Sequence, residues 1–225
     1  MTQRRTRRSA LSLLSLAALG ATLGVGAGEG APAPLNPRAI IERMSDRNPT
    51  LRSYKARVHV DVRMLNFPYL APKLDGTSYY KRPDLFLVVF DRVPFYARGF
   101  QRIFNDIGSP RAWVKDENVS VNGIAYLDGR ETIVLRLTKK IHSDILDHTL
   151  AYVDPSDYSL VRMEWYYTSG GVIAMTQTYR TQGMYSFVVQ QHATIDIPHV
   201  RAVADSSYGT YETNVPVDGA GSAAQ

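Results

Sequence analysis

DGTSYYKRPDLFLVVF, residues 75–90, predicts two β-strands joined at a proline. Thr77–Lys81 is rich in aromatic and β-branched residues, which favour a strand. Pro83 has no N–H to donate to a sheet, so it should end that strand and hold Arg82 extended at the rim. Leu85–Phe90 is apolar at every position, which predicts a second strand covered on both faces. By spacing alone, the stretch would also fit a surface turn with two solvated cations.

The preceding segment, residues 54–64, alternates completely between apolar and polar side chains. One face carries Tyr54, Ala56, Val58, Val60, Val62 and Met64, and the other carries Lys55, Arg57, His59, Asp61 and Arg63. Period two over eleven residues predicts a strand with one dry and one wet face. His59 and Asp61 could form a metal or acid–base pair, but their otherwise cationic face favours an ordinary solvated surface.

Two amphipathic helices are expected. Asn36-Pro37 fits an N-cap with proline in the first turn, and the helix should run to about Arg47 with Ile40, Ile41 and Met44 on its apolar face. Pro94–Ile107 has aromatic and apolar residues at helical spacing and could form a lid over the sheet, with Ser109-Pro110 ending it.

Short strands separated by turn residues fill the remainder of the chain. Asn122-Gly123 and Asp128-Gly129 suit tight hairpins, Asp154-Pro155 and Gly170-Gly171 suit turns, and Pro198 interrupts a late strand. The expected strands are 132–138, 146–153, 160–168, 172–182, 187–197 and 201–213. Their spacing predicts an antiparallel barrel or sandwich.

The first 27 residues fit a secretory signal peptide. Four arginines precede the apolar run Ala10–Ala27, and Val25-Gly26-Ala27 offers small residues for cleavage. Thr6–Leu11 lies close to a twin-arginine motif, so Sec and Tat export both remain open, as does an uncleaved anchor. Without these residues, 22 basic side chains face 21 acidic ones, which gives no global attraction to nucleic acid.

The expected organisation is a signal peptide (1–27), a Gly/Ala/Pro linker (28–36), one β domain (37–217) and a disordered tail (218–225). The chain contains no cysteine, which excludes disulfides, thiolate metal sites and a lipid-attachment cysteine. The mature domain must therefore depend on its hydrophobic core.

No catalytic motif with proper spacing occurs in the sequence. It has no Gly-x-Ser-x-Gly elbow, no His-Glu-x-x-His and no phosphate loop. His142, Asp144 and His148 would share one face of an unbroken strand and could suit a metal, but Ser143-Asp144 predicts a turn that breaks this parity. We therefore expect no enzyme, no cofactor and no metal site.

Lys81-Arg82-Pro83-Asp84-Leu85-Phe86, a few residues after Gly76, resembles the Lys-Arg-Pro motif of LolA-type lipoprotein carriers. Upstream, the expected helix leading into Leu51–Val58 resembles the family's helix followed by Ser, an aromatic residue and Ala at the first strand. The likeness covers about Ile40–Phe90 and, more weakly, Ile133–Tyr179, and residues 91–122 do not align.

The resemblance implies a mainly β (α+β) fold, a half-open antiparallel β-barrel closed by lid helices around an apolar cavity. The family's functional arginine, which helps hold the lid closed, falls on Arg82, and its aromatic residue falls on Phe86. An arginine suits this role because it offers five donors and keeps its charge. The residues expected at the ligand are Arg82, Phe86, Val88, Phe90, Tyr54, Val58, Val60, Val62, Met64, Met163 and Trp165.

The function so implied is that of an exported, periplasmic or otherwise extracytoplasmic carrier. It would shield acyl chains of a lipoprotein or lipid between a membrane-bound donor and acceptor, as a monomer and without nucleic acid. Two alternatives stay open: a sensor or adaptor of the same fold that binds a partner protein or lipid in envelope stress signalling, and, more remotely, a hydrolase with an unrecognised site.

Overall fold

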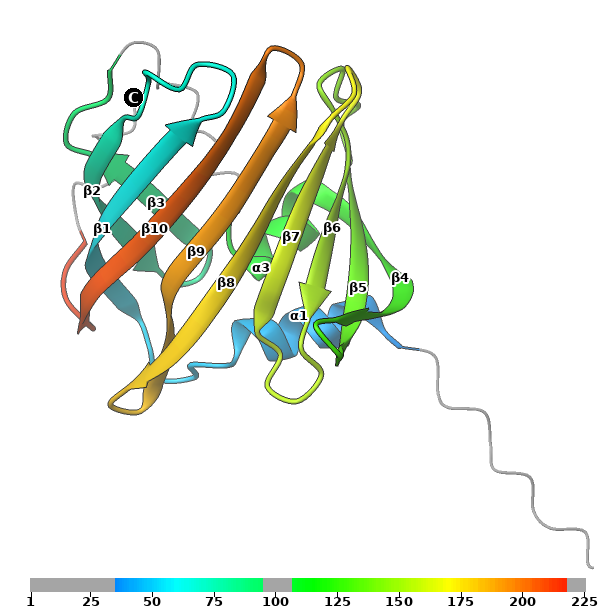
Figure 1. The fold of residues 1–225 in the computed structure, drawn as a ribbon. Helices are drawn as coiled ribbons and strands as arrows, with labels where there is room; N and C mark the ends of the chain where they lie inside the picture. Colours follow the sequence, from blue (N-terminus) through cyan, green and yellow to red (C-terminus); the bar gives the residue numbers. More distant parts are fainter. Residues whose placement is uncertain (1–34, 95–106, 218–225) are drawn as a thin grey trace, which may run out of the picture. The chain divides into compact units, whose positions relative to one another are not determined.

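Ten strands form one antiparallel sheet in the computed structural model, which describes residues 35–94 and 107–217 (Figure 1). They are β1 (Ser53–Met64), β2 (Lys73–Lys81), β3 (Leu85–Phe90), β4 (Glu117–Leu127), β5 (Arg130–Lys139), β6 (Leu146–Val153), β7 (Leu160–Tyr167), β8 (Val172–Gln182), β9 (Tyr185–Ile197) and β10 (Val200–Thr213). The order is β3-β2-β1-β10-β9-β8-β7-β6-β5-β4. Since β3 and β4 form the two edges, the sheet does not close, which confirms the half-open antiparallel barrel.

Burial along β1 follows the alternation in the sequence. Ala56, Val58, Val60 and Val62 are buried, whereas Arg57, Asp61 and Arg63 are exposed. The strand pairs with β2 on one side and with the C-terminal strand β10 on the other, so it lies inside the sheet. Its dry face therefore belongs to the concave side, where the core gathers.

The stretch at 75–90 forms the expected hairpin. β2 ends at Lys81 and β3 begins at Leu85, on either side of Pro83. The expectation that β3 is covered on both faces is only partly correct, because Leu87, Val88 and Phe90 are buried while Leu85, Phe86 and Val89 are half-buried. The physical reason is that β3 forms an edge of the sheet and has a strand neighbour on one side only.

Helix α1 (Pro37–Ser45) begins as its sequence predicts. Asn36 caps it by accepting hydrogen bonds from the backbone N–H groups of Arg38 and Ala39. Its apolar residues are buried, namely Ile40, Ile41 and Met44. The helix ends at Ser45, two residues before the expected end.

Helix α3 (Pro110–Asp116) corrects one expectation. Ser109-Pro110 begins a helix rather than ending one, because the Ser109 hydroxyl accepts from the backbone N–H of Ala112 and proline is well suited to the first turn. The helix predicted over Pro94–Ile107 falls almost entirely on residues outside the described part of the chain, as do the signal peptide, most of the linker and the tail.

The two Gly-containing hairpin signals have different outcomes. Asp128 and Gly129 adopt positive φ values of 50° and 78° between β4 and β5, which confirms that tight hairpin. The turn predicted at Asn122-Gly123 is wrong, because both residues lie inside β4. There the register with β5 shifts between Val121 and Gly123, and Gly123 has φ 124°, so the glycine serves a β-bulge.

The core lies between the concave face of the sheet and the two helices. Ile40 and Met44 of α1 and Trp113 of α3 pack in one cluster with Val60 of β1 and Met163 of β7. A second, smaller cluster gathers aromatic side chains near the start of β1 and the β8–β9 turn. In Figure 1 both helices lie behind the sheet as drawn, on the side toward which it curves. No helix within the described residues is long and apolar enough to cross a membrane.

Candidate functional site

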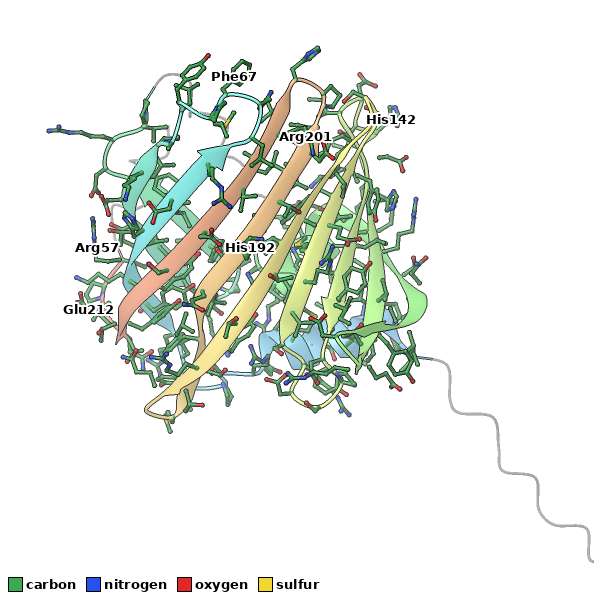
Figure 2. All side chains as sticks on the ribbon, viewed as in Figure 1. Arg57, Phe67, His142, His192, Arg201 and Glu212 are labelled. Atoms are coloured by element: carbon green, nitrogen blue, oxygen red, sulfur yellow. The ribbon has the colours of Figure 1, made fainter. Side chains whose placement is uncertain are left out.

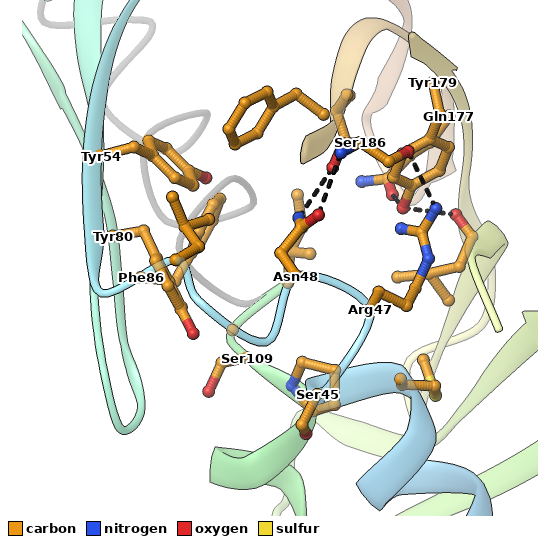
Figure 3. A pocket seen from close by; sticks show the side chains of 18 of the residues that line it. Ser45, Arg47, Asn48, Tyr54, Tyr80, Phe86, Ser109, Gln177, Tyr179 and Ser186 are labelled. Carbon is orange, nitrogen blue, oxygen red and sulfur yellow. Dashed lines mark hydrogen bonds between the residues drawn. The ribbon is translucent and has the colours of Figure 1, made fainter. Parts of the chain in front are cut away.

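A cavity of about 180 Å³ lies between the concave face of the sheet and the helical side of the fold (Figure 3). α1 and the segment after it form one side, and the N-terminal end of α3 contributes Ser109 and Trp113. The sheet contributes residues from both of its halves, including Tyr54, Phe86 and Tyr179. The cavity lies where the two hydrophobic clusters meet.

One wall of the cavity is aromatic, and strand register builds it. Tyr54 of β1 pairs with Tyr80 of β2, and Tyr80 pairs with Phe86 of β3, so the three side chains form a row across three strands. The Tyr54 and Tyr80 rings stack with centroids 5.4 Å apart. Phe187 and Tyr211 extend this wall and stack 4.0 Å apart. Such a wall offers a large apolar surface with hydroxyl groups at its margins.

The opposite wall is polar, and hydrogen bonds hold several of its side chains in place. The Arg47 guanidinium donates to the carboxylate of Asp157 at 2.8 Å and to the hydroxyl of Ser186 at 3.1 Å, and it lies 4.5 Å from the centroid of the Tyr179 ring. The amide of Asn48 makes a reciprocal pair with the backbone of Ser186, donating at 2.9 Å and accepting at 3.0 Å. These bonds fasten the segment after α1 to the β6–β7 loop and to β9.

Burial keeps three tyrosine hydroxyls of the cavity, those of Tyr54, Tyr179 and Tyr208, in their neutral form by raising their pKa values. Burial raises the pKa of Tyr179 to about 12, although the neighbouring Arg47 acts in the opposite direction. Burial also raises the pKa values of Tyr54 and Tyr208 well above the ordinary value. No aspartate or glutamate is among the described residues that line the cavity. The described lining is therefore largely aromatic and apolar, with a polar margin.

Arg82 lies at the β2–β3 turn beside the cavity, next to the lining residue Pro83. Its Nη2 donates to the backbone carbonyl of Asn48 at 2.9 Å, while its own backbone N–H donates to the carbonyl of Arg52 at 2.8 Å. Its Nε is buried and has no hydrogen-bond partner among the described residues. Arg82 thus connects the edge hairpin to the segment that follows α1.

The residues expected at the ligand fall into two groups. Tyr54 and Phe86 line the cavity directly, and Arg82 borders it through Pro83. The others belong to the core beneath, buried or half-buried: Val58, Val60, Val62, Met64, Val88, Phe90, Met163 and Trp165. Their contact with a ligand stays a prediction.

Sequence reasoning missed most of the polar wall. Arg47 meets Asp157 and Ser186, which lie 110 and 139 residues further along the chain, so no local pattern indicates these contacts. Tyr80 and Tyr211 could have been found, because each is an aromatic residue on the inward side of a predicted strand.

The histidine–carboxylate pairs considered in the sequence lie on the surface. His59 contacts Asp61 at 3.3 Å and also Asp75 at 2.8 Å on the polar face of β1, and His142 contacts Asp144 at 3.3 Å in the β5–β6 loop. His148 lies apart from them, stacked on Tyr166. Within residues 35–94 and 107–217, no group of three His, Cys, Asp or Glu side chains could hold a metal ion.

Comparison with known proteins gives matches at the level of structure only. No protein-family model and no curated protein matches the chain. A LolA superfamily protein from Nitrosomonas europaea superposes with a TM-score of 0.63 at 14% identity, covering 82% of this chain and 96% of that one. The chain has the LolA-like fold.

Two further structures share this LolA-like fold. A putative outer membrane lipoprotein-sorting protein domain from Vibrio parahaemolyticus has a TM-score of 0.63 at 10% identity and covers 82% of this chain and 96% of that chain. A DUF1329 family protein from Desulfovibrio piger has a TM-score of 0.60 at 11% identity, covering 81% and 93%. At these identities the likeness concerns the fold, and function must be argued from the site.

Proposed function

We propose that the chain is an extracytoplasmic lipid-binding carrier that shields an acyl chain in the cavity between sheet and helices. The observation that carries this proposal is the aromatic wall formed by Tyr54, Tyr80 and Phe86, which faces a cavity with no carboxylate among its described lining residues. Apolar burial favours acyl chains by about 0.8 kcal/mol per methylene. The LolA-like fold, shared with a structure described as a lipoprotein-sorting domain, supports the same function.

The size of the cavity limits what it holds. About 180 Å³ is close to an engineered cavity of about 150 Å³ that holds one benzene molecule, and it lies below the roughly 300–1,000 Å³ of pockets for drug-sized ligands. The cavity as described therefore accommodates part of one acyl chain. A cargo with several chains requires the helices to move away from the sheet.

Such a movement would extend the site into the core. Val58, Val60, Val62, Met64, Val88, Phe90, Met163 and Trp165 underlie the helices and would line the enlarged space. Arg82 would regulate this movement of the helices, because its hydrogen bond to Asn48 holds the segment after α1 against the β2–β3 hairpin. Phe86 and Tyr54 would contact the bound acyl chain both before and after the helices move.

We further propose that the protein acts outside the cytoplasm as a monomer that exchanges its cargo with membrane-bound donor and acceptor proteins. The arginine-rich start and the apolar run that follows support export. The near balance of charge after removal of that segment agrees with a lipid ligand rather than a nucleic acid.

Native mass spectrometry of the purified protein, together with titration of a fluorescent fatty acid, tests this function. Co-purified lipid and saturable probe binding are expected. Phe86→Asp should weaken probe binding because it places a carboxylate in the apolar wall, whereas Phe67→Asp, in the exposed β1–β2 loop, should leave it unchanged. An empty protein that binds no probe, or equal effects of the two substitutions, would contradict the carrier. Stable capture of a partner protein without lipid would favour the sensor.

A further inference from the structure

The loop between β1 and β2, residues 65–72, exposes a cluster of large apolar side chains. Its sequence is LNFPYLAP, and Leu65, Phe67 and Tyr69 keep 48%, 39% and 78% of their surface exposed. The Phe67 and Tyr69 rings meet edge to face, with centroids 6.3 Å apart. Figure 2 shows Phe67 at the extreme end of the sheet, away from Glu212 at the far end of β10.

Hydrogen bonds hold this loop in a fixed shape. The Asn66 amide donates to the carbonyl of His199 at 2.8 Å and accepts from the backbone N–H of Arg201 at 3.2 Å, which joins the loop to the β9–β10 turn. The backbone N–H of Leu65 donates to the carbonyl of Arg201 at 2.7 Å, and that of Leu70 to Phe67 at 2.8 Å. The apolar side chains are therefore presented on an ordered support.

Charge is arranged around the loop rather than within it. None of its eight residues is charged, and Arg63 and Lys73 bracket it in the sequence. Lys73 pairs with Asp61 at 3.2 Å and Arg201 pairs with Asp196 at 3.5 Å, whereas the exposed Arg63 forms no ion pair with any residue in the described part of the chain. An apolar tip with Arg63 at its base, a cation that has no ion-pair partner among the described residues, matches a bilayer interface, where aromatic rings lie among headgroups and a cation meets anionic lipid.

We propose that the β1–β2 loop is a membrane-docking element that inserts Phe67 and Tyr69 into the interface of an anionic lipid bilayer. An exposed tip formed by Leu65, Phe67 and Tyr69 offers much less than the roughly 800 Å² per partner that stable protein complexes bury. Shallow insertion into a bilayer needs only a few apolar side chains assisted by attraction to anionic headgroups. The β5–β6 loop at the same end of the sheet adds the exposed Ile141.

This docking element is separate from the cavity. β2 begins at Lys73 beside the loop and ends at Lys81, just past the cavity residue Tyr80, so the two sites lie at opposite ends of one strand. Changes in the loop should consequently alter membrane binding without altering ligand binding. The proposal does not depend on the identity of the cargo.

Flotation of the purified protein with vesicles of phosphatidylethanolamine and phosphatidylglycerol tests the proposal. The parent should bind, and the double substitution Phe67→Ser and Tyr69→Ser should lower partitioning about tenfold or more. Met184→Ser is the matched control, because Met184 is 75% exposed but lies in the β8–β9 turn at the other end of the sheet. Arg63→Gln should weaken binding to these vesicles and leave binding to phosphatidylcholine vesicles unchanged.

Three results would overturn membrane docking. The first is a parent protein that does not float with the vesicles. The second is a Met184→Ser variant that loses as much binding as the loop double variant. The third is self-association that the loop variant abolishes while vesicle binding persists, since this would make the loop a contact between copies of the chain. Unchanged thermal unfolding of each variant ensures that the comparison concerns binding, not folding.

Discussion

At the scale of single residues, Arg82 joins the β2–β3 turn to the segment after α1 through a charged hydrogen bond to Asn48. Arg82→Leu should lower the free energy of unfolding by about 1.5 kcal/mol, the low end for the loss of a hydrogen bond from a charged group. The loss is small because the substitution also removes the buried Nε, which has no hydrogen-bond partner among the described residues. Backbone amides in α1 and residues 46–52 should then exchange faster, while those of the central strands should not. Hydrogen exchange measures both regions together.

The control for this prediction is Arg82→Lys, which should restore part of the protection because a lysine keeps the charge but lacks the planar fork. If exchange in α1 is the same in Arg82→Leu as in the parent, the arginine does not hold this segment, and its proposed role at the lid is lost.

Asp157 is the residue through which pH should act on the polar wall. Its partial burial raises its pKa, but hydrogen bonds from Ser159 and the charge of Arg47 outweigh this effect, so the pKa lies below its usual range. Because this pKa is lower in the folded state, the ionised Asp157 stabilises the fold at pH values above its unfolded pKa of about 3.9. This stabilisation is lost as the pH falls through the folded pKa.

Asp157→Asn should therefore lower the free energy of unfolding at neutral pH by less than about 1 kcal/mol, since the carboxylate is half exposed. The difference in the free energy of unfolding between the parent and Asp157→Asn should become smaller at acidic pH. Urea denaturation across a pH series measures this difference, and a gap that stays constant down to strong acid would show that the Arg47–Asp157 pair contributes nothing.

At the scale of elements, the β2–β3 hairpin depends on the close approach of two backbones at Gly76. A Cβ added there would collide with the carbonyl oxygen of Val89 and with the Cα of Phe90, which are backbone atoms that cannot turn aside. Gly76→Ala should destabilise the protein by about 1–3 kcal/mol, as overpacking does. Because β3 forms the sheet edge beside the cavity, probe binding should fall as well.

The matched control is Gly209→Ala in β10, where the new Cβ would meet the Cβ of Arg57 at an ordinary 3.7 Å. This change should be neutral or stabilise by about 0.5 kcal/mol, because alanine restricts the unfolded chain. Thermal unfolding of the two variants separates these cases, and equal melting temperatures would refute the close-approach argument.

At the scale of the whole molecule, the sheet and helices together set how much of a ligand is buried. Affinity for straight-chain fatty acids should rise about fourfold per added methylene while the chain still enters the cavity. It should level off once the space of about 180 Å³ is filled. Displacement of a fluorescent probe by fatty acids of increasing length measures how affinity depends on chain length. Affinity independent of chain length would mean that acyl chains bind elsewhere.

The sequence by itself determined the local features of this protein. The alternation along residues 54–64 and the proline after Arg82 specify strands and their ends, because side-chain parity and backbone donors are properties of neighbouring residues. Asp128-Gly129 specifies its hairpin for the same reason. Among cavity residues, Tyr54 was predicted from this alternation, and Phe86 from the resemblance around Lys81-Arg82-Pro83.

Only the tertiary structure decided how these pieces meet. Asn122-Gly123 carries the same turn signal as Asp128-Gly129, but pairing with β5 places it inside a strand as a bulge. The union of β1 with β10 and the contact of Arg47 with Asp157 join segments more than a hundred residues apart. Such contacts depend on which apolar faces the whole chain buries together, and this information is not local to any stretch of sequence.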